Sequence, residues 1–175
     1  KIKSYYEPFL GSGAVFFNIA QQYEIENAFL YDINDELIIC YKVIQNDVTR
    51  VIEILSDYQQ TYLKLNHLKR NQFFYNERSQ FNMNRLRINY QKCSENWYKH
   101  ASQLIFLNHT CYNGLYRVNS KGDFNSPIGT YENPKIFNEK NLQAVNRILQ
   151  KAEIQKADYK KLISDLKPDS FVYFD

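Results

Sequence analysis

The sequence has little of what metal sites and disulfide frameworks require. Its 175 residues include three histidines and three cysteines, Cys40, Cys93 and Cys111. Because the cysteines are widely spaced and odd in number, they indicate neither a disulfide framework nor a metal-binding pair, which is typical of the reducing cytosol. Three histidines are too few to indicate a metal-ligand cluster. We therefore expect no metal cofactor.

Long apolar runs are also missing. Hydrophobic residues make up 44% of the chain, yet no apolar run reaches the ~18 residues that a membrane-spanning helix needs. No signal-peptide pattern opens the sequence. We expect a cytoplasmic protein with one domain or one domain that carries a smaller insert.

Acidic residues are scarce in the middle of the chain. Residues 58–140 contain 12 Lys and Arg but only 5 Asp and Glu, a net charge of +7, whereas the whole chain has a net charge of +3. Such a concentration of positive charge is expected where a segment meets a polyanion. A solvated helical surface would have the same composition.

The most informative stretch lies near the start, at residues 5–17. Aromatic residues lead through Pro8 into Gly11-Ser12-Gly13, and an apolar run at helical spacing begins near Ala14. This pattern predicts a strand, a tight glycine loop and a helix. Glycines let the loop turn sharply, and free helix amides point at the same place. Such a loop binds nucleotide-like ligands at the carboxyl edge of a parallel sheet, although an isolated Gly-x-Gly is more often an ordinary turn.

A second strand, which ends in an acid, supports the prediction of a nucleotide-binding site. Phe29-Leu30-Tyr31-Asp32 is a short apolar strand that ends in an acid, about 20 residues on, where nucleotide-binding folds place the carboxylate that binds ribose hydroxyls. Asp32 could instead cap a helix that begins near Asp35. Helices are predicted at residues 35–44, 48–68, 96–107, 136–152 and 160–166.

Residues from Tyr58 to about Lys140 interrupt this alternation of strands and helices. Within them, Leu115–Val118 and Asp123–Asn125 flank the turn residues Asn119–Gly122, which predicts a β-hairpin. A two-stranded ribbon fits the major groove, where Arg117 could contact guanine, and Tyr112 could stack beside the duplex. A surface hairpin packed on the insert through its aromatic residues is the alternative.

The end of the chain returns to strands. A short strand at residues 154–159 ends in Asp158 and Tyr159, which could accept from an adenine amine and pack on its ring; Asp158 could equally cap a helix. A buried parallel strand is predicted at Phe171–Phe174. Asp175 then follows, where an acid would face the ligand crevice or belong to a frayed end.

Together these stretches resemble the Dam-type DNA adenine-N6 methyltransferases, which include enzymes of restriction–modification systems that act on GATC. The resemblance covers essentially the whole chain, and its hairpin is the most specific part. The matching segments are the cofactor motif Glu7–Gly13, the ribose-binding segment Tyr31–Asn34, the DNA-reading segment Asn113–Pro127, the adenine-side segment Ala157–Tyr159, and Phe171–Asp175, the strand before the catalytic Asp-Pro-Pro-Tyr.

The resemblance implies an α/β fold: a Rossmann-like S-adenosylmethionine-dependent methyltransferase core, residues 1–57 and 141–175, and a mostly helical DNA-recognition insert, residues 58–140, that carries the β-hairpin. It implies methyl transfer from S-adenosylmethionine to N6 of a flipped-out adenine in duplex DNA, in the sequence GATC, without a metal. Asp175 would be catalytic, accepting a hydrogen bond from the adenine amine. The cofactor would be bound by Glu7, Pro8, Phe9, Gly11, Ser12, Gly13, Asp32, Asp158 and Tyr159. DNA would be bound by Tyr112, Asn113, Leu115, Arg117, Asn119, Lys121, Asn125 and Pro127.

Two departures from the family pattern affect the expected activity. The family's N-terminal Trp-Ala-Gly-Gly-Lys block and the Pro-Pro-Tyr after Asp175 are both missing from the sequence. We therefore expect an interior piece of a longer enzyme, truncated at both ends, with little or no activity of its own. A cognate restriction endonuclease that acts on the same site is a possible partner.

Three other functions compete with this one. The first is a catalytically inactive DNA-binding module that kept the same fold. The second is an RNA or small-molecule methyltransferase, of which a small-molecule enzyme would not need the basic insert or its hairpin. The third is a dinucleotide oxidoreductase, which would require a longer glycine pattern with glycine in place of Phe16.

Overall fold

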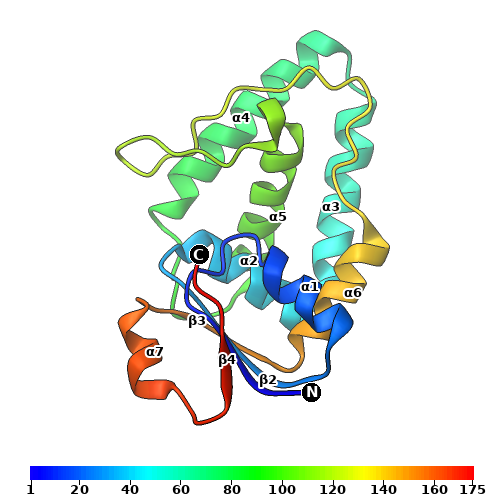
Figure 1. The fold of residues 1–175 in the computed structure, drawn as a ribbon. Coiled ribbons are helices and arrows are strands. Elements are labelled where there is room, and N and C mark those ends of the chain that lie inside the picture. The colour runs from blue at the N-terminus through cyan, green and yellow to red at the C-terminus, as the bar shows by residue number, and fades with distance from the viewer. The chain divides into compact units, whose positions relative to one another are not determined.

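The computed structural model describes residues 1–175. They form two compact units, one made of residues 1–46 and 143–175 and the other of residues 47–142 (Figure 1). No helix in the chain is both long enough and apolar enough to cross a membrane.

The first unit is built on a four-stranded parallel sheet with the strand order β3-β2-β1-β4. The predicted α/β class is therefore confirmed. The strands are β1 (Ile2–Glu7), β2 (Ile25–Asp32), β3 (Ala152–Lys156) and β4 (Ser170–Val172), and the helices are α1 (Ala14–Gln22), α2 (Asp35–Asn46), α6 (Glu139–Leu149) and α7 (Lys160–Asp165).

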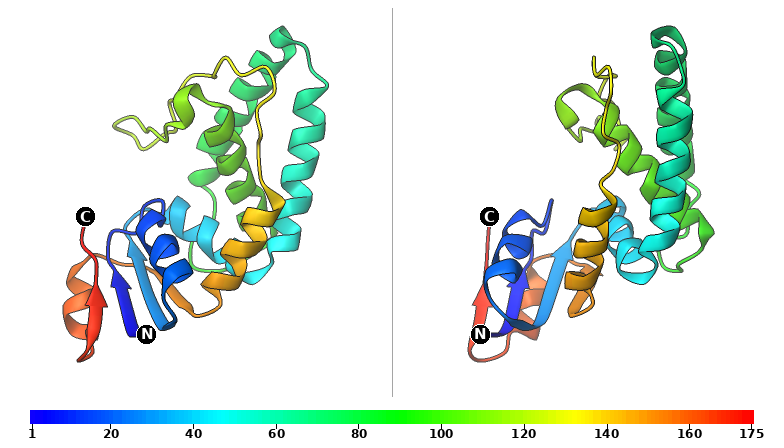
Figure 2. Two further views of the ribbon diagram at one scale, coloured as in Figure 1. Left: turned by 45° about the vertical axis from the view of Figure 1, so that its right-hand side comes forward. Right: turned by 90° about the vertical axis from the view of Figure 1, so that its right-hand side faces the viewer.

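Both faces of this sheet are covered by helices (Figure 2). Successive side chains of a strand point to opposite faces, and β1 uses this alternation with two buried tyrosines. The ring of Tyr5 lies 5.4 Å from that of Phe16 in α1. The ring of Tyr6 stacks on Phe29 at 4.6 Å and packs in one cluster with Leu162 of α7. The core of the sheet thus lies on both sides of β1.

The strand order predicts a ligand position beside β1. From β1 the chain moves outward through β2 to β3, and it later returns to the other side of β1 as β4. In open parallel sheets, ligands bind outside the carboxyl ends of the strands where the winding direction changes. Here that point lies between β1 and β4, beside the glycine loop and the residues that follow Val172.

The second unit is helical, with α3 (Val48–Leu63), α4 (His67–Arg85), α5 (Glu95–Thr110) and the single turn η1 (Tyr112–Gly114). Helix α5 packs against both α3 and α4. Its Phe106 is fully buried, and the ring of Phe106 stacks on that of Tyr58 of α3 at 4.8 Å. Phe73 of α4 meets the ring of Phe106 edge-on at 5.6 Å. Aromatic side chains therefore join the three helices.

Several predicted boundaries were wrong. The helix predicted at 48–68 ends at Leu63, because the side chain of Asn66 accepts from the backbone N of Lys69 at 3.0 Å and begins α4. The helix predicted at 136–152 covers only Glu139–Leu149, and β3 begins at Ala152. The strand predicted as buried at residues 171–174 is the edge strand β4, and Phe171 is 44% exposed.

The predicted β-hairpin is also shorter than expected. Residues 115–125 contain no regular strand, and a single antiparallel bridge joins Val118 to Phe124. The turn is nevertheless closed, since the backbone N of Asn125 donates to the carbonyl of Arg117 at 2.9 Å. We call residues 112–127 the recognition loop.

The aromatic packing of the second unit predicts the effect of a cavity mutation. Phe106→Ala should lower the free energy of unfolding by about 3–5 kcal/mol, the range for large buried rings. Urea denaturation followed by fluorescence measures this, because the single tryptophan, Trp97, is buried in the same helix. Leu68→Ala is the control, since Leu68 is largely exposed; equal losses in both variants would contradict the assigned packing.

Candidate functional site

The loop between β1 and α1 is held by hydrogen bonds to the neighbouring elements. The backbone N of Leu10 donates to the carbonyl of Tyr31 at 2.9 Å, and the hydroxyl of Tyr41 donates to the carbonyl of Gly11 at 3.0 Å. The backbone N of Gly13 closes the turn on the carbonyl of Leu10 at 2.7 Å. The loop is therefore fixed to β2 and α2 before any ligand binds.

The two glycines of this loop are required for different reasons. Both have a left-handed backbone, with φ of 48° at Gly11 and 66° at Gly13. A Cβ on Gly13 would lie 2.8 Å from the ring of Phe17 and 3.0 Å from the hydroxyl of Tyr41, whereas a Cβ on Gly11 would meet nothing closer than 4.0 Å. Gly13 therefore permits close packing, and Gly11 faces open space.

Asp32 connects the end of β2 to this loop. Its Oδ2 accepts from the backbone N of Gly11 at 2.9 Å, and its Oδ1 accepts from the backbone N of Asn34 at 2.8 Å. The alternative role as the cap of α2 is wrong, because the side chain of Asn34 accepts from the backbone N of Glu36 and fills that place. An ionised carboxylate has about four acceptor positions, so both oxygens can accept further donors.

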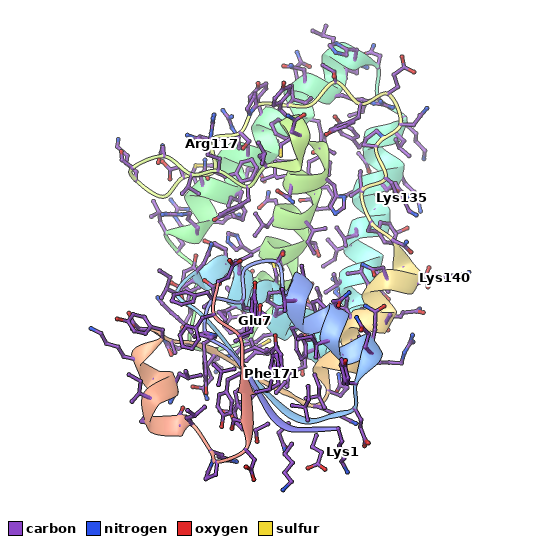
Figure 3. The ribbon with its side chains drawn as sticks, viewed as in Figure 1. Lys1, Glu7, Arg117, Lys135, Lys140 and Phe171 are labelled. Carbon is purple, nitrogen blue, oxygen red and sulfur yellow. The ribbon has the colours of Figure 1, made fainter.

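Glu7 lies buried at the end of β1 (Figure 3). It accepts from the hydroxyl of Tyr5 at 2.6 Å and from the backbone N of Phe16, in the first turn of α1. Burial raises the pKa of Glu7, and the negative charge of Asp175 raises it further. The two carboxyl groups are therefore close enough to interact, although β1 and β4 end more than 160 residues apart in the sequence.

Three aromatic side chains lie at the same edge of the sheet. The ring of Phe9 is 5.9 Å from that of Tyr159 and 6.2 Å from that of Phe174. All three are about half exposed, at 44%, 42% and 54%. They form an aromatic surface next to the glycine loop, on which a planar ring could stack.

The remaining predicted cofactor residues surround this surface. Pro8 is buried and Ser12 is exposed. Asp158 accepts from the backbone N of Lys160 at 2.9 Å, at the start of α7. The alternative role of Asp158 as the N-cap of α7 is therefore wrong, because Tyr159 is the N-cap and Asp158 closes only a local turn before the helix. The structure thus brings the predicted cofactor residues to one edge of one unit, while their contacts with a ligand stay a prediction.

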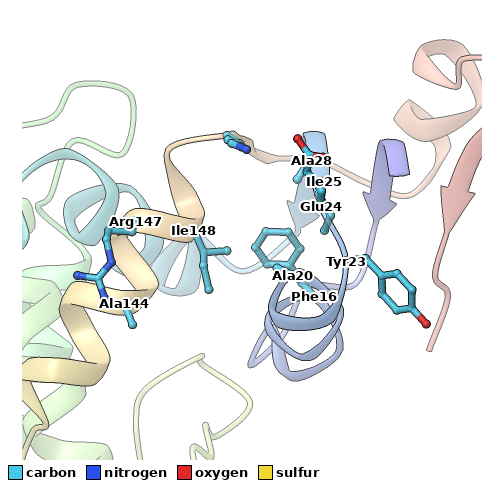
Figure 4. A pocket seen from close by; sticks show the side chains of 10 residues that line it. Phe16, Ala20, Tyr23, Glu24, Ile25, Ala28, Ala144, Arg147 and Ile148 are labelled. Carbon is cyan, nitrogen blue, oxygen red and sulfur yellow. The ribbon is translucent and has the colours of Figure 1, made fainter. Parts of the chain in front are cut away.

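A cavity of about 340 Å³ lies elsewhere in the same unit (Figure 4). It is bounded by α1, α6 and the beginning of β2, and its apolar lining includes Phe16, Ile25 and Ile148. Since Ile25 is the first residue of β2, this cavity is at the amino end of that strand. It does not lie at the carboxyl edge of the sheet, where the glycine loop and Asp32 meet.

The recognition loop of the second unit is stabilised by its own turn. Oδ1 of Asn119 accepts from the backbone N of Lys121 at 2.9 Å and from that of Asp123 at 3.0 Å. The hydroxyl of Ser126 donates to the carbonyl of Leu115 at 2.5 Å. These contacts leave Tyr112 and Leu115 exposed, at 53% and 58%.

Helix α4 supports this loop with three polar side chains that sequence reasoning missed. The side-chain amide of Asn82 forms two hydrogen bonds with the backbone of Phe124: it accepts from the N at 2.8 Å and donates to the carbonyl at 3.1 Å. Arg78 donates to the carbonyl of Ser126 at 3.0 Å, and Arg85 donates to that of Lys121 at 3.0 Å. Their spacing of four and three residues places them on one helix face, which is the signal that could have identified them.

Arg117 projects from the recognition loop (Figure 3). Its Nε donates to Oδ1 of Asn125 at 3.1 Å. This contact uses only the Nε donor of the guanidinium. The two terminal nitrogens stay available, and such a pair can bind O6 and N7 of guanine in the major groove. The exposed Asn113, Asn119, Lys121 and Pro127 lie on the same loop.

Comparison with known proteins identifies the family. The family model of the D12 class N6 adenine-specific DNA methyltransferases matches residues 1–175. The chain belongs to this family. The resemblance recognised in the sequence is thereby confirmed, and with it the enzymatic class.

Relatives in this family come from archaea and bacteria. The chain is 48% identical over 174 residues to the type II methyltransferase M.MjaIII of Methanocaldococcus jannaschii, covering 99% of the chain and 58% of the relative. It is 33% identical to M1.LlaDCHI of Lactococcus lactis subsp. cremoris, covering 100% and 56%, and 30% identical to a DNA adenine methylase of Haemophilus influenzae, covering 97% and 52%. The chain therefore spans about half the length of the curated relatives it matches.

The two glycines allow a paired test of the loop geometry. Gly11→Ala should cost about 1–2 kcal/mol of stability for a left-handed alanine. Gly13→Ala should cost a further ~1–3 kcal/mol, because its methyl group collides with Phe17 and Tyr41. Urea denaturation followed by circular dichroism measures both. Ser12→Ala serves as the control at an exposed position, and equal losses for the two glycine variants would refute the packing difference.

Proposed function

We propose that the whole protein transfers a methyl group from S-adenosylmethionine to N6 of adenine in duplex DNA, within GATC or a closely related sequence. The observation that carries this proposal is the glycine loop bonded to Asp32 at the crevice of a chain that belongs to the D12 class. Relatives are named DNA adenine methylases and type II methyltransferases. By the same analogy, a cognate endonuclease would cut unmethylated sites, and the reaction would take place in the cytoplasm.

The two units suit two parts of this task. Residues 1–57 and 141–175 were assigned from sequence to the cofactor core, and residues 58–140 to target recognition. Helix α3 lies wholly in the second compact unit, which begins at Asp47. We propose the first unit as the cofactor core and the second as the recognition insert.

The glycine loop would bind S-adenosylmethionine. Because Gly11 has no side chain and faces open space, a ligand can approach its backbone closely. Asp32 would accept from the ribose hydroxyls, and Asp158 with Tyr159 would bind the adenine ring. When bound, S-adenosylmethionine supplies an electrophilic methyl group.

Asp175 would orient the target amine. The lone pair of the adenine amine is delocalised into its ring, so it is a poor nucleophile. A carboxylate that accepts a hydrogen bond from this amine localises the lone pair and holds it in line for transfer. The target must first leave the duplex, and Phe174, which is half exposed at this edge and not assigned to the cofactor, offers a stacking partner.

The cofactor site can be tested by calorimetric titration of the full-length protein with S-adenosylhomocysteine. Saturable binding is expected, and Asp32→Ala should weaken it at least tenfold, because that change removes both the ribose acceptor and the bond to Gly11. Asp35→Ala is the matched control, since this neighbouring acid pairs with Lys156 at 2.6 Å. If the wild-type protein does not bind, or if both variants bind as tightly as it does, the proposed site is wrong.

The recognition role of Arg117 has a separate test. Arg117→Ala should reduce the preference for a GATC duplex over a scrambled duplex by roughly 5- to 150-fold, the equivalent of about 1–3 kcal/mol for a bidentate guanine contact. Lys121→Ala should instead weaken binding to both duplexes equally. It should lower the slope of log K against log salt by about 1. Fluorescence anisotropy on both duplexes distinguishes these outcomes, and an equal loss on the two duplexes for Arg117→Ala would contradict its role.

A further inference from the structure

A second cavity, of about 270 Å³, lies in the helical unit, away from the recognition loop residues. It is formed where α4 ends and α5 begins. None of its lining residues belongs to the DNA-binding set predicted from the sequence. They are Asn84, Arg87, Ile88, Asn96, Lys99, His100 and Gln103.

The lining carries two cations that form no salt bridge. They are Arg87 and Lys99, and both are exposed. The side-chain amides of Asn84 and Asn96 add neutral donors beside them. Cations and amide donors around one concave surface are the groups that bind phosphate oxygens.

Two acids adjacent to lining residues, Glu95 and Glu77, already have hydrogen-bond partners. Glu95 accepts from Arg50 at 2.5 Å, and this contact, with a smaller effect from Lys99, lowers the pKa of Glu95. Glu77 accepts from the hydroxyl of Tyr58 at 2.7 Å and from the amide of Gln103 at 2.7 Å. The cavity therefore keeps a positive local charge.

The walls of the cavity are fixed in place. The indole N–H of Trp97 donates to the carbonyl of Asn89 at 2.7 Å, which holds the segment that carries Arg87. His100 stacks on Phe81 at 4.3 Å, and Phe81 meets Phe124 of the recognition loop edge-on at 6.3 Å. Two ring contacts thus connect the cavity wall to the base of the recognition loop within one unit.

We propose that this cavity binds one phosphate of the DNA backbone beside the sequence that the recognition loop contacts. This proposal rests on the proposed function, because it requires duplex DNA at the loop. A duplex presents phosphates continuously along both strands, so a strand that reaches the loop continues past it. Arg87 and Lys99 would hold the register of the duplex without reading its bases.

The test compares the salt dependence of DNA binding by the full-length protein and by the double variant Arg87→Gln/Lys99→Gln. The slope of log K against log salt should fall by about 1, the value for one lost phosphate contact. The affinity should fall by the same factor on GATC and scrambled duplexes. The control is Lys64→Gln/Lys69→Gln, which changes two exposed lysines, one at the C-cap of α3 and one in the first turn of α4, and should leave the slope nearly unchanged. An unchanged slope in the cavity variant, or an equal fall in both variants, overturns the proposal.

Neutral methylphosphonate links, placed one at a time around GATC, locate the contact. One position should weaken wild-type binding and have no further effect on the cavity variant. Titration with inorganic phosphate is the second part of the test. If phosphate binding depends on Arg87 and Lys99 but no methylphosphonate position weakens DNA binding, the cavity binds free phosphate and the DNA proposal is overturned. If the wild-type protein binds no DNA, the proposed function fails. If it prefers GATC but the cavity variant keeps its slope, only this inference fails.

Discussion

The hydrogen bond from the backbone N of Gly11 to Asp32 Oδ2 is the contact on which the candidate cofactor site depends. It joins the loop after β1 to the end of β2, which pair in parallel with Glu7 opposite Leu30. A loop with two left-handed glycines has high conformational entropy in the unfolded chain. By ordering the loop in the folded state, this bond, together with the one from Tyr41, prepares a ligand surface that binding need not create.

The recognition loop is also ordered by hydrogen bonds from a neighbouring element, which here come from the side chains of a helix. One backbone bridge is too little to hold a hairpin in water. Helix α4 supplies the missing partners, and Asn82 takes the place of a neighbouring strand by pairing with both backbone groups of Phe124. In both units a loop that carries candidate site residues is thus held by hydrogen bonds from neighbouring elements, which is how precise sites are built on loops.

Sequence reasoning succeeded where the determinants are local. The glycine loop, the acid at the end of β2 and the turn around Asn119 each follow from residues that are close in the chain, and the structure has a loop or turn at each. It failed where a partner is distant or where two signals compete. The apolar period continues past Leu63, so the cap at Asn66 was overlooked. The pairing of Asn82 with Phe124 joins residues 42 positions apart, and no local pattern reveals it.

Burying the carboxylate of Glu7 at the end of β1 costs folding stability. A carboxyl group whose folded-state pKa is raised binds its proton more tightly in the folded protein than in the unfolded chain. Its contribution to stability is therefore present at low pH and is lost as the pH rises through the raised pKa. Tyr5 and the amide of Phe16 offset part of the cost of burying the charge. An apolar residue at this position would avoid the cost, but it could not accept from the amide at the start of α1. Glu7 thus connects β1 to α1 directly behind the glycine loop, at the expense of stability above its raised pKa.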